Sequence, residues 1–328
     1  FGSDRNPSEI FIPLSEFVDR EGHRPDFSSV VEMQIVVEWA DAEGSIRLEE
    51  IGFLDVWEEE VTLSEDVVGL ANELIIPDGF VAEAIADDLA AVTQIAFTPS
   101  GDMLVSLQEG RIWRYRDEDG DDLYDHRSLY ASGYEEVVGL LHDPLDEAVW
   151  IGGRGQLYRT EDTDETGVAD TSERRIDGLP WGRHQNNGLI WNPIPDPFTG
   201  EDAYHWIYFG LGSTGDLEDG GPINSTVLRF PRTGQSVDDL EVVSRGNRNV
   251  YDLVWAPVPI DFQAMEGQTA WQLFASENGP DFENEPDEVN HILWQHDYGF
   301  PDHFGSVIDG EIEGQPYTGP VYSVAPHA

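Results

Sequence analysis

The chain has 328 residues, of which 66 are acidic and 17 basic, and its formal net charge is -49. All basic residues are scattered arginines, so the sequence lacks the basic patch that phosphate binding needs, which argues against nucleic-acid binding. An acidic disordered protein is excluded, because 11% of the residues are aromatic and spaced apolar runs can bury a core. So anionic a surface needs salt to screen its self-repulsion, which indicates a halophilic source.

Cysteine is absent from the sequence, which excludes disulfides, zinc-thiolate sites and cysteine nucleophiles. No window approaches the roughly 20 apolar residues of a membrane span, so we expect no transmembrane segment. The chain does not begin with Met, so an export signal would lie upstream of it. We therefore expect an extracellular or periplasmic protein.

Residues 1–60 are predicted to form a separate β module. Val30–Trp39 alternates and is rich in β-branched residues, which is typical of a strand, and further apolar runs flank it. The pattern resembles the last strands of a galactose-binding-like jelly roll of the kind found in carbohydrate-binding modules. Two interpretations stay open: a sugar-binding module in which Trp39 and Trp57 stack on sugar, and an accessory layer in which both lie in the core.

Residues 61–78 are predicted to be an acidic linker, and a pattern that repeats at roughly 45 to 55 residues follows. Each repeat has an apolar strand, a Pro or Gly turn, a second strand that ends in small residues, and a third edge strand. The repeats begin near Val81, Val137, Asn187 and Val250. A fifth is predicted to begin at 320–326. Residues 79–328 are therefore predicted to form a β-propeller.

The most distinctive motifs lie in the fourth repeat. Ser244–Leu253 reads S-R-G-N-R-N-V-Y-D-L, Ser276–Ile292 contains N-G-P-D and D-E-V-N, and Tyr298–Pro301 reads Y-G-F-P. Together they resemble one blade of the soluble glucose and sorbosone (aldose sugar) dehydrogenases, which are six-bladed β-propellers that bind pyrroloquinoline quinone (PQQ) and calcium. The resemblance implies an all-β chain with part of a six-bladed propeller. Because four repeats and the start of a fifth would leave open edges, we expect further blades outside this sequence.

The resemblance implies three catalytic and cofactor-binding residues. His184 lies in G-R-H-Q-N-N-G-L, where the family places the general base that removes the sugar's hydroxyl proton as hydride moves to the quinone. Arg248 and Asn249 match the family's Arg-Asn pair, which stabilises negative charge at the quinone carbonyl. The residues alone leave a structural alternative open for two of them, a loop hydrogen bond for His184 and an ion pair between blades for Arg248.

Two segments are candidate calcium (Ca2+) sites. In the family, the backbone carbonyls of a Gly-Pro pair ligate the calcium that binds PQQ, and Gly279 and Pro280 match that pair. A second candidate loop follows the EF-hand spacing, with Gly at the sixth position. Its ligands would be Asp162, Asp164, Thr166, Asp170 and Glu173. Asp117–Asp125 is a partial match to the same spacing. Chance matches in so acidic a chain are the alternative, and paired acidic loops also resemble a propeller branch of membrane-bound dehydrogenases.

These implications predict a secreted, halophilic quinoprotein that oxidises an aldose or a related sugar or aldehyde by hydride transfer to PQQ. Electrons would leave to an external acceptor such as a haem protein. Gly210–Ser213 and Tyr134–Glu136 stand where glucose dehydrogenases carry a Gly-Asp-Gln-Gly turn and a substrate-binding Gln, which argues against glucose. The alternative is a non-catalytic propeller that binds glycans or a protein partner. A propeller hydrolase or lactonase ranks last, because no inward set of Asp, Asn and Glu ligands is evident.

Overall fold

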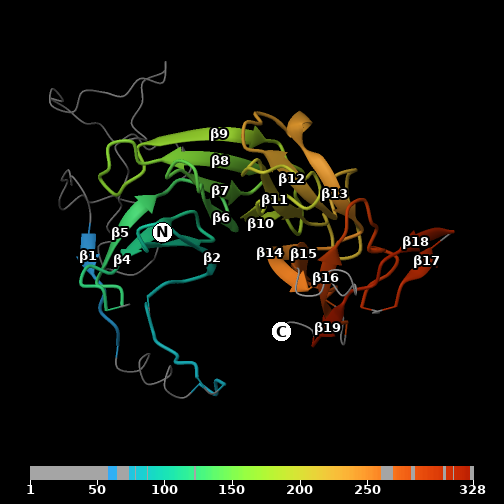
Figure 1. Cartoon of the computed structure of the whole chain (residues 1–328), viewed down its shortest axis with the longest axis horizontal. Helices are drawn as coiled ribbons and strands as arrows, with labels where there is room; N and C mark the ends of the chain where they lie inside the picture. The colour runs from blue at the N-terminus through green and yellow to red at the C-terminus, as the bar shows by residue number, and fades with distance from the viewer. Residues whose placement is uncertain are drawn as a thin grey trace, which may run out of the picture. The chain divides into compact units, whose positions relative to one another are not determined.

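The computed structural model describes residues 58–64, 74–77, 79–86, 88–121, 123–259, 269–281, 285–305, 308–312 and 314–325 (Figure 1). Within these ranges the chain is all-β, and the helical element is a short 3-10 turn, η3 (Val237–Asp239). No helix in the described ranges is long and apolar enough to cross a membrane. The predicted jelly roll, including Trp39 and Trp57, lies outside the described residues except for its last three, and its boundaries stay a prediction.

The strands form four antiparallel sheets and one separate hairpin. The first sheet consists of β1 (Glu58–Glu60), β2 (Val92–Phe97), β3 (Met103–Leu107), β4 (Ile112–Arg116) and β5 (His126–Ala131). The second consists of β6 (Gly139–His142), β7 (Val149–Gly153), β8 (Gln156–Glu161) and β9 (Thr171–Asp177). The third consists of β10 (Asn186–Trp191), β11 (Trp206–Leu211), β12 (Thr226–Pro231) and β13 (Glu241–Arg245).

The fourth sheet differs from the others in how it is completed. It consists of β14 (Val250–Pro259), β15 (Thr269–Glu277), β16 (Asp287–Ile292) and β19 (Tyr322–Val324). The separate hairpin, β17 (Gly310–Ile312) and β18 (Gln315–Tyr317), stands between its last two strands in the chain. Because β19 pairs with β16 from Asp287↔Val324 to Val289↔Tyr322, residues 322–324 belong to the fourth sheet. The prediction that a fifth repeat begins at 320–326 is therefore wrong.

The strand at the inner edge of each sheet contacts the corresponding strand of the next sheet, from β2 to β6, β10 and β14. Figure 1 shows these strands on the inner side of an arc of sheets, with the last strands on the outer side. Consecutive four-stranded meanders around a common centre are the arrangement of β-propeller blades. The expected all-β propeller is confirmed, with four blades in the described residues.

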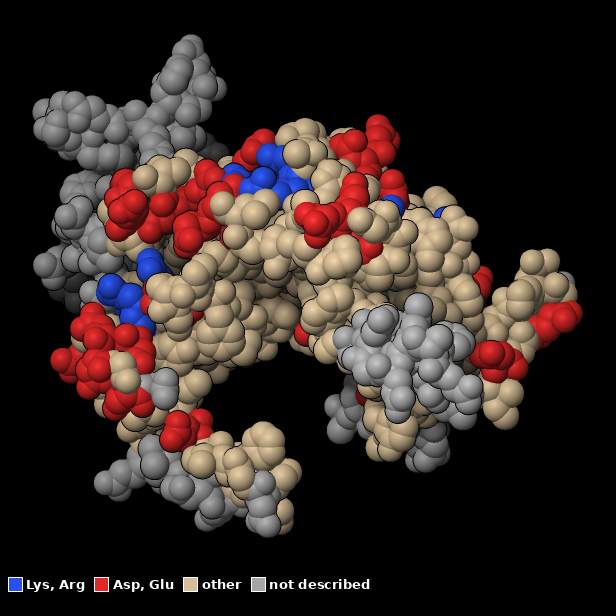
Figure 2. Space-filling view, viewed as in Figure 1, with Lys and Arg blue, Asp and Glu red and all other residues tan. Residues whose placement is uncertain are grey.

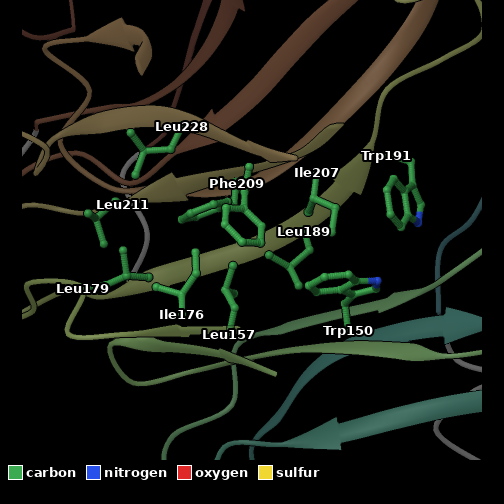
Figure 3. Packing of buried hydrophobic residues seen from close by; sticks show 11 residues of the cluster. Trp150, Leu157, Ile176, Leu179, Leu189, Trp191, Ile207, Phe209, Leu211 and Leu228 are labelled. Atoms are coloured by element: carbon green, nitrogen blue, oxygen red, sulfur yellow. The ribbon is translucent and has the colours of Figure 1, made fainter. Parts of the chain in front are cut away.

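The core fills the spaces between consecutive blades. One cluster joins the first and second sheets, another the second and third, and the last the third and fourth. In the middle cluster, Trp150 lies near Trp191 (Figure 3). It contacts both Trp191 and Phe230 edge-on, at ring-centroid distances of 6.3 Å. All three side chains are buried. Of the inner strands, β6 and β10 lie between two neighbouring blades, and β10 is buried along nearly its whole length. The strands β2 and β14 each contact one neighbouring blade among the described residues, and their burial is mixed.

Two features of the strand prediction were wrong. Residues 81–86, expected to be the first strand of the first repeat, form no strand. The segment after them, expected to be the second strand, instead forms both β2 and β3. Each blade also has a fourth strand where three were expected. The outer strands β5, β9 and β13 were missed because they carry little apolar periodicity; the first four residues of β9, for example, are exposed.

Acidic side chains gather on the outer parts of the blades. Figure 2 shows a dense group over the loop between β4 and β5 and further groups along the outer strands, whereas few charges mark the inner edge on this face. The arrangement keeps like charges on the solvated outer loops, where water and salt screen them.

Candidate active site

A cleft of about 360 Å³ lies where the inner strands begin. Its lining comes from the starts of β2 and β14, the segments that precede β6 and β10, and the turns that follow β3, β7 and β15. All four inner strands run in the same direction through their blades, so the segments that lead into them meet at one end of the propeller. His184 and Asn249, two of the predicted site residues, both line this cleft.

Ser213, which follows β11, determines which nitrogen of the neutral His184 ring carries the hydrogen. The hydroxyl of Ser213 donates its one hydrogen to the carbonyl of Gly215, at 2.8 Å. The same oxygen lies 2.9 Å from Nδ1 of His184, so it accepts from Nδ1–H. In the neutral ring, Nε2 then carries the lone pair and is the atom that can accept a proton.

Burial, together with the positive charges of Arg248 and Arg183, lowers the pKa of His184 to about 4. The side chain is half-buried in the lining of the cleft. At neutral pH the imidazole is therefore uncharged, which is the state a general base requires. The sequence motif suggested the base, but neither its tautomer nor its low pKa.

Gly212 brings His184 and Asn249 together. A Cβ atom on Gly212 would lie 2.4 Å from Cβ of His184 and 2.9 Å from Oδ1 of Asn249, so no larger residue fits between them. The N–H of Gly212 donates to the carbonyl of Gln185, at 3.0 Å, and that of Ser213 to the carbonyl of Arg248, at 2.8 Å. The turn after β11 thus links the two predicted site segments through backbone hydrogen bonds.

The orientation of the Asn249 amide is fixed by Asn187, a buried residue of β10. The Nδ2 group of Asn187 donates to Oδ1 of Asn249, at 2.8 Å, and to the carbonyl of Val250, at 2.7 Å. The oxygen of Asn249 is therefore occupied, and its own Nδ2–H group remains to donate into the cleft that it lines. An amide donor in this position can bind a carbonyl or oxyanion oxygen.

Arg248 lies beside the cleft and is not among its described lining residues. Its side chain is 1% exposed. The guanidinium donates to the carbonyl of Asp216 at 3.0 Å, to the carboxylate of Asp216, to the carbonyl of Asn278 at 2.9 Å and to Asp281 at 3.3 Å. These bonds use four of its five N–H groups, so one N–H of Nη1 remains. The ion pairs match the structural alternative, and the predicted contact with the quinone stays a prediction.

The buried side chain of Glu277, at the end of β15, holds the Arg248–Asn249 segment in place through hydrogen bonds. It accepts hydrogen bonds from the backbone N–H of Arg248, from Asn247 at 3.1 Å and from Asn290 at 2.9 Å. Burial raises the pKa of Glu277, and the neighbouring Glu288 raises it further. Its position in the site segment was not predicted.

Gly279 and Pro280 are both buried in the loop after β15 and are not among the residues that line the cleft. The N–H of Gly279 donates to Oδ1 of Asp287, at 2.8 Å. A Cβ on Gly279 would lie 2.2 Å from the carbonyl of Pro286, which explains the need for glycine in this loop. Calcium ligation by the Gly279 and Pro280 carbonyls stays a prediction.

The five residues predicted as a second calcium site do not all lie in one loop. Four of them lie in the loop between β8 and β9, and Glu173 lies on β9. Asp162 accepts from the N–H groups of Thr166, at 3.0 Å, and Gly167, at 2.7 Å. Asp164 accepts from the hydroxyl of Thr166, at 3.0 Å, and Asp170 from that of Thr163, at 2.6 Å. Glu173 lies on β9, where its carboxylate pairs with Arg175 at 2.9 Å.

The loop that was only a partial match has the closer carboxylates. Among the described residues, Asp117, Asp119 and Asp125 have carboxylate oxygens within 4.8 Å of one another. Mutual repulsion, chiefly from Asp121, raises the pKa of the exposed Asp119. The Asp117 group is therefore the acidic cluster that the described structure brings together, although Asp117 and Asp125, like Asp162, accept hydrogen bonds from N–H groups of their own loop.

The described lining of the cleft reverses the charge balance of the chain. Arg154 and Arg183 are its basic residues, and Glu136 is its one acidic residue, in a protein with 66 acidic side chains. Glu136 is ion-paired with Arg154, and Arg183 with Asp281. Each of the two arginines is therefore balanced by a carboxylate, so the described lining of the cleft lacks the excess negative charge of the outer loops.

No family model matches the chain, and no curated protein matches it. Solved structures do. A PQQ-bound aldose sugar dehydrogenase of Streptomyces coelicolor is 22% identical, with a TM-score of 0.53 over 74% of this chain and 70% of that one. An oxidoreductase (glucose dehydrogenase) of Thermus thermophilus is 23% identical, with a TM-score of 0.52 over 74% and 72%.

A third match is the holo form of the pyranose dehydrogenase PQQ domain of Coprinopsis cinerea, which is 12% identical, with a TM-score of 0.55 over 74% of this chain and 67% of that one. At these identities the likeness concerns the fold. The described strands and these three matches agree with the resemblance noted in the fourth repeat. The chain therefore has the β-propeller fold of the PQQ-dependent sugar dehydrogenases.

Proposed function

We propose that this protein is a PQQ-dependent dehydrogenase that oxidises the CH–OH group of an aldose or related sugar. The observation that carries the proposal is the pairing of two groups in one cleft. His184 presents an uncharged ring whose Nε2 accepts a proton, and Asn249 presents an amide N–H donor. Sugar oxidation needs a base for the hydroxyl proton and a donor for the oxygen that gains negative charge.

The donor set of the cleft fits a quinone that carries carboxylates. Arg183, Asn249 and Asn278 line it beside Thr93 and Gln108, and its one acidic residue is neutralised by Arg154. A bound PQQ supplies the hydride acceptor. Asn249 would donate to an oxygen of the bound group, and Arg248 would add the field of a buried positive charge beside it.

The work of the protein itself is proton transfer and orientation. Nε2 of His184 takes the proton from the sugar hydroxyl as the C–H bond breaks. The Ser213 oxygen stabilises the resulting imidazolium, because Nδ1–H already donates to it. The carbonyls of Gly279 and Pro280 would ligate Ca2+ beside the cofactor.

The same proposal includes where the protein acts and where its electrons go. The protein would be exported, to the extracellular space or the periplasm, in a halophilic organism. It would pass electrons to an external acceptor such as a haem protein. Its acidic outer loops, shown in Figure 2, suit a concentrated salt solution.

The proposal is tested by titrating PQQ into the full, metal-free protein in molar KCl, with and without Ca2+, and recording the quinone absorption. We expect a saturable, Ca2+-dependent spectral shift. Asn249→Ala should weaken PQQ binding at least several-fold. Asn192→Ala is a control for the loss of a buried Asn, because Asn192 lies outside the lining of the cleft. The absence of any shift at saturating Ca2+ would contradict the proposal.

A further inference from the structure

The cleft contains a large aromatic side chain that the proposed chemistry does not use. Trp181 is 53% exposed, although it belongs to the lining beside His184. Most tryptophans of the described chain, such as Trp113, Trp150 and Trp191, are buried between strands. Leaving an indole ring half in water forgoes the burial that usually stabilises it, so its place in the cleft requires a reason.

The Trp181 ring is supported from one side. The guanidinium carbon of Arg154 lies 4.7 Å from the ring centroid, in cation–π geometry. Gly155, at φ +70°, brings its turn so close that an added Cβ would lie 3.1 Å from Cδ1 of the ring. The indole is thus fixed by the turn between β7 and β8, while about half of its surface remains open.

Glu136 connects this support to the segment of the catalytic base. Its carboxylate pairs with Arg154 through two bonds, one of them at 2.8 Å from Nε. Its backbone has φ +42°, a left-handed conformation that non-glycine residues rarely adopt. Its carbonyl accepts from Nε2 of Gln185, at 2.7 Å, and Gln185 is the residue after His184. A chain of contacts therefore links the Trp181 indole, through the Arg154–Glu136 ion pair, to the segment that contains His184.

We propose that Trp181 is the sugar-stacking platform of the cleft and that the neighbouring Glu136–Arg154 pair binds sugar hydroxyls; this rests on the proposed function. The C–H face of a pyranose ring is apolar and packs on the open face of an indole. A carboxylate and a guanidinium beside it accept from and donate to hydroxyl groups. Trp181 is then a specificity-determining residue that positions a pyranose, and a short open-chain aldehyde would gain little from it.

The test compares Trp181→Ala and Trp181→Phe with Trp271→Ala. Trp271 is 39% exposed on β15 and lies outside the lining of the cleft, so it is a matched control. Calorimetric titration of the cofactor-free full chain with pyranose aldoses gives Kd, and the loaded enzyme gives KM and kcat for a pyranose and for glyceraldehyde. Thermal unfolding shows that each variant folds.

We expect Trp181→Ala to raise Kd and KM for the pyranose about 3- to 10-fold, with kcat changed less. Trp181→Phe should retain most of the affinity, and Trp271→Ala should match the wild type. KM for glyceraldehyde should not change in any variant. Equal effects on the pyranose and on glyceraldehyde, or no pyranose binding by the wild type, would overturn the inference.

The two proposals fail separately in this experiment. If the loaded enzyme oxidises a pyranose and Trp181→Ala changes neither Kd nor KM, the platform is wrong and the dehydrogenase stands. If PQQ does not bind but pyranose binding depends on Trp181, the platform stands and the protein is a glycan-binding propeller. If Trp181→Ala abolishes the PQQ absorption shift and leaves the pyranose Kd unchanged, the indole contacts the quinone, and the platform is wrong.

Discussion

Replacing Ser213 by Ala tests the link between the turn after β11 and the catalytic base. The change removes the acceptor 2.9 Å from Nδ1 of His184 and the donor 2.8 Å from the carbonyl of Gly215. A neutral imidazole without that acceptor is free to adopt the other tautomer, in which Nε2 carries the proton and cannot act as a base. A net hydrogen bond contributes about 0.5–1.5 kcal/mol, which corresponds to a change of about 2- to 12-fold in the ratio of the competent tautomer to the other one.

We therefore expect kcat of the loaded enzyme to fall by up to about 12-fold, with KM for the sugar little changed. Nitrogen NMR of histidine-labelled protein measures the tautomer directly, and in the variant the Nδ1–H form should lose population. Ser323→Ala is the control, because its hydroxyl also donates to a glycine carbonyl, that of Gly305 at 2.8 Å, away from His184. An unchanged rate together with an unchanged tautomer would refute the role given to Ser213.

Three further predictions concern pH, close packing and the core. The acid limb of kcat/KM should lie near pH 4, because burial and the neighbouring arginines lower the pKa of His184 from 6.5 to about 4. An acid limb near pH 6.5 would show that the His184 ring is not buried beside these charges. Since only the unfolded chain takes up this proton between those values, stability should fall as pH drops from about 6.5 to about 4, and less so in His184→Asn. Gly212→Ala should reduce activity at least tenfold and lower Tm, because its Cβ would lie 2.4 Å from that of His184; wild-type values would refute the contact. Trp150→Ala should lower the free energy of unfolding in denaturant titrations by about 3–5 kcal/mol, and a loss below about 1 kcal/mol would contradict its burial.

The inner strands of the second, third and fourth sheets were predictable because their apolar residues pack against a neighbouring blade. β6, β10 and β14 are apolar runs that end at turn residues, and the sequence pattern located them to within a few residues. The outer strands pair along one edge and face solvent, so they carry charged residues with no apolar period. β9 illustrates the consequence, because it contains Glu173, which the spacing had assigned to a calcium loop.

The strand that completes the fourth sheet was misassigned for a different reason. β19 pairs with β16 only after the chain has formed the β17–β18 hairpin. The sequence of residues 322–324 does not indicate which earlier strand they pair with. Their partner depends on where the β17–β18 hairpin places the chain that follows it.

The candidate site was predicted in part. His184 and Asn249 come from motifs some sixty residues apart, and both reach one cleft, as the resemblance implied. Gly212 and Ser213 were noted only as departures from a family turn, because their contact with His184 depends on where β11 ends against β10. Trp181 gave no sequence signal, since an aromatic residue before a strand is usually core.

The most direct test of the proposed function is an anaerobic single-turnover experiment with PQQ-loaded protein and an aldose, in wild type and His184→Ala. The wild type should convert the oxidised quinone spectrum to the reduced one within a single turnover. His184→Ala should bind PQQ with unchanged affinity, because Asn249 and the donors around it remain, yet reduce it about 10²- to 10⁴-fold more slowly. Reduction of the quinone at the wild-type rate by His184→Ala would contradict the assignment of the base on which the account rests.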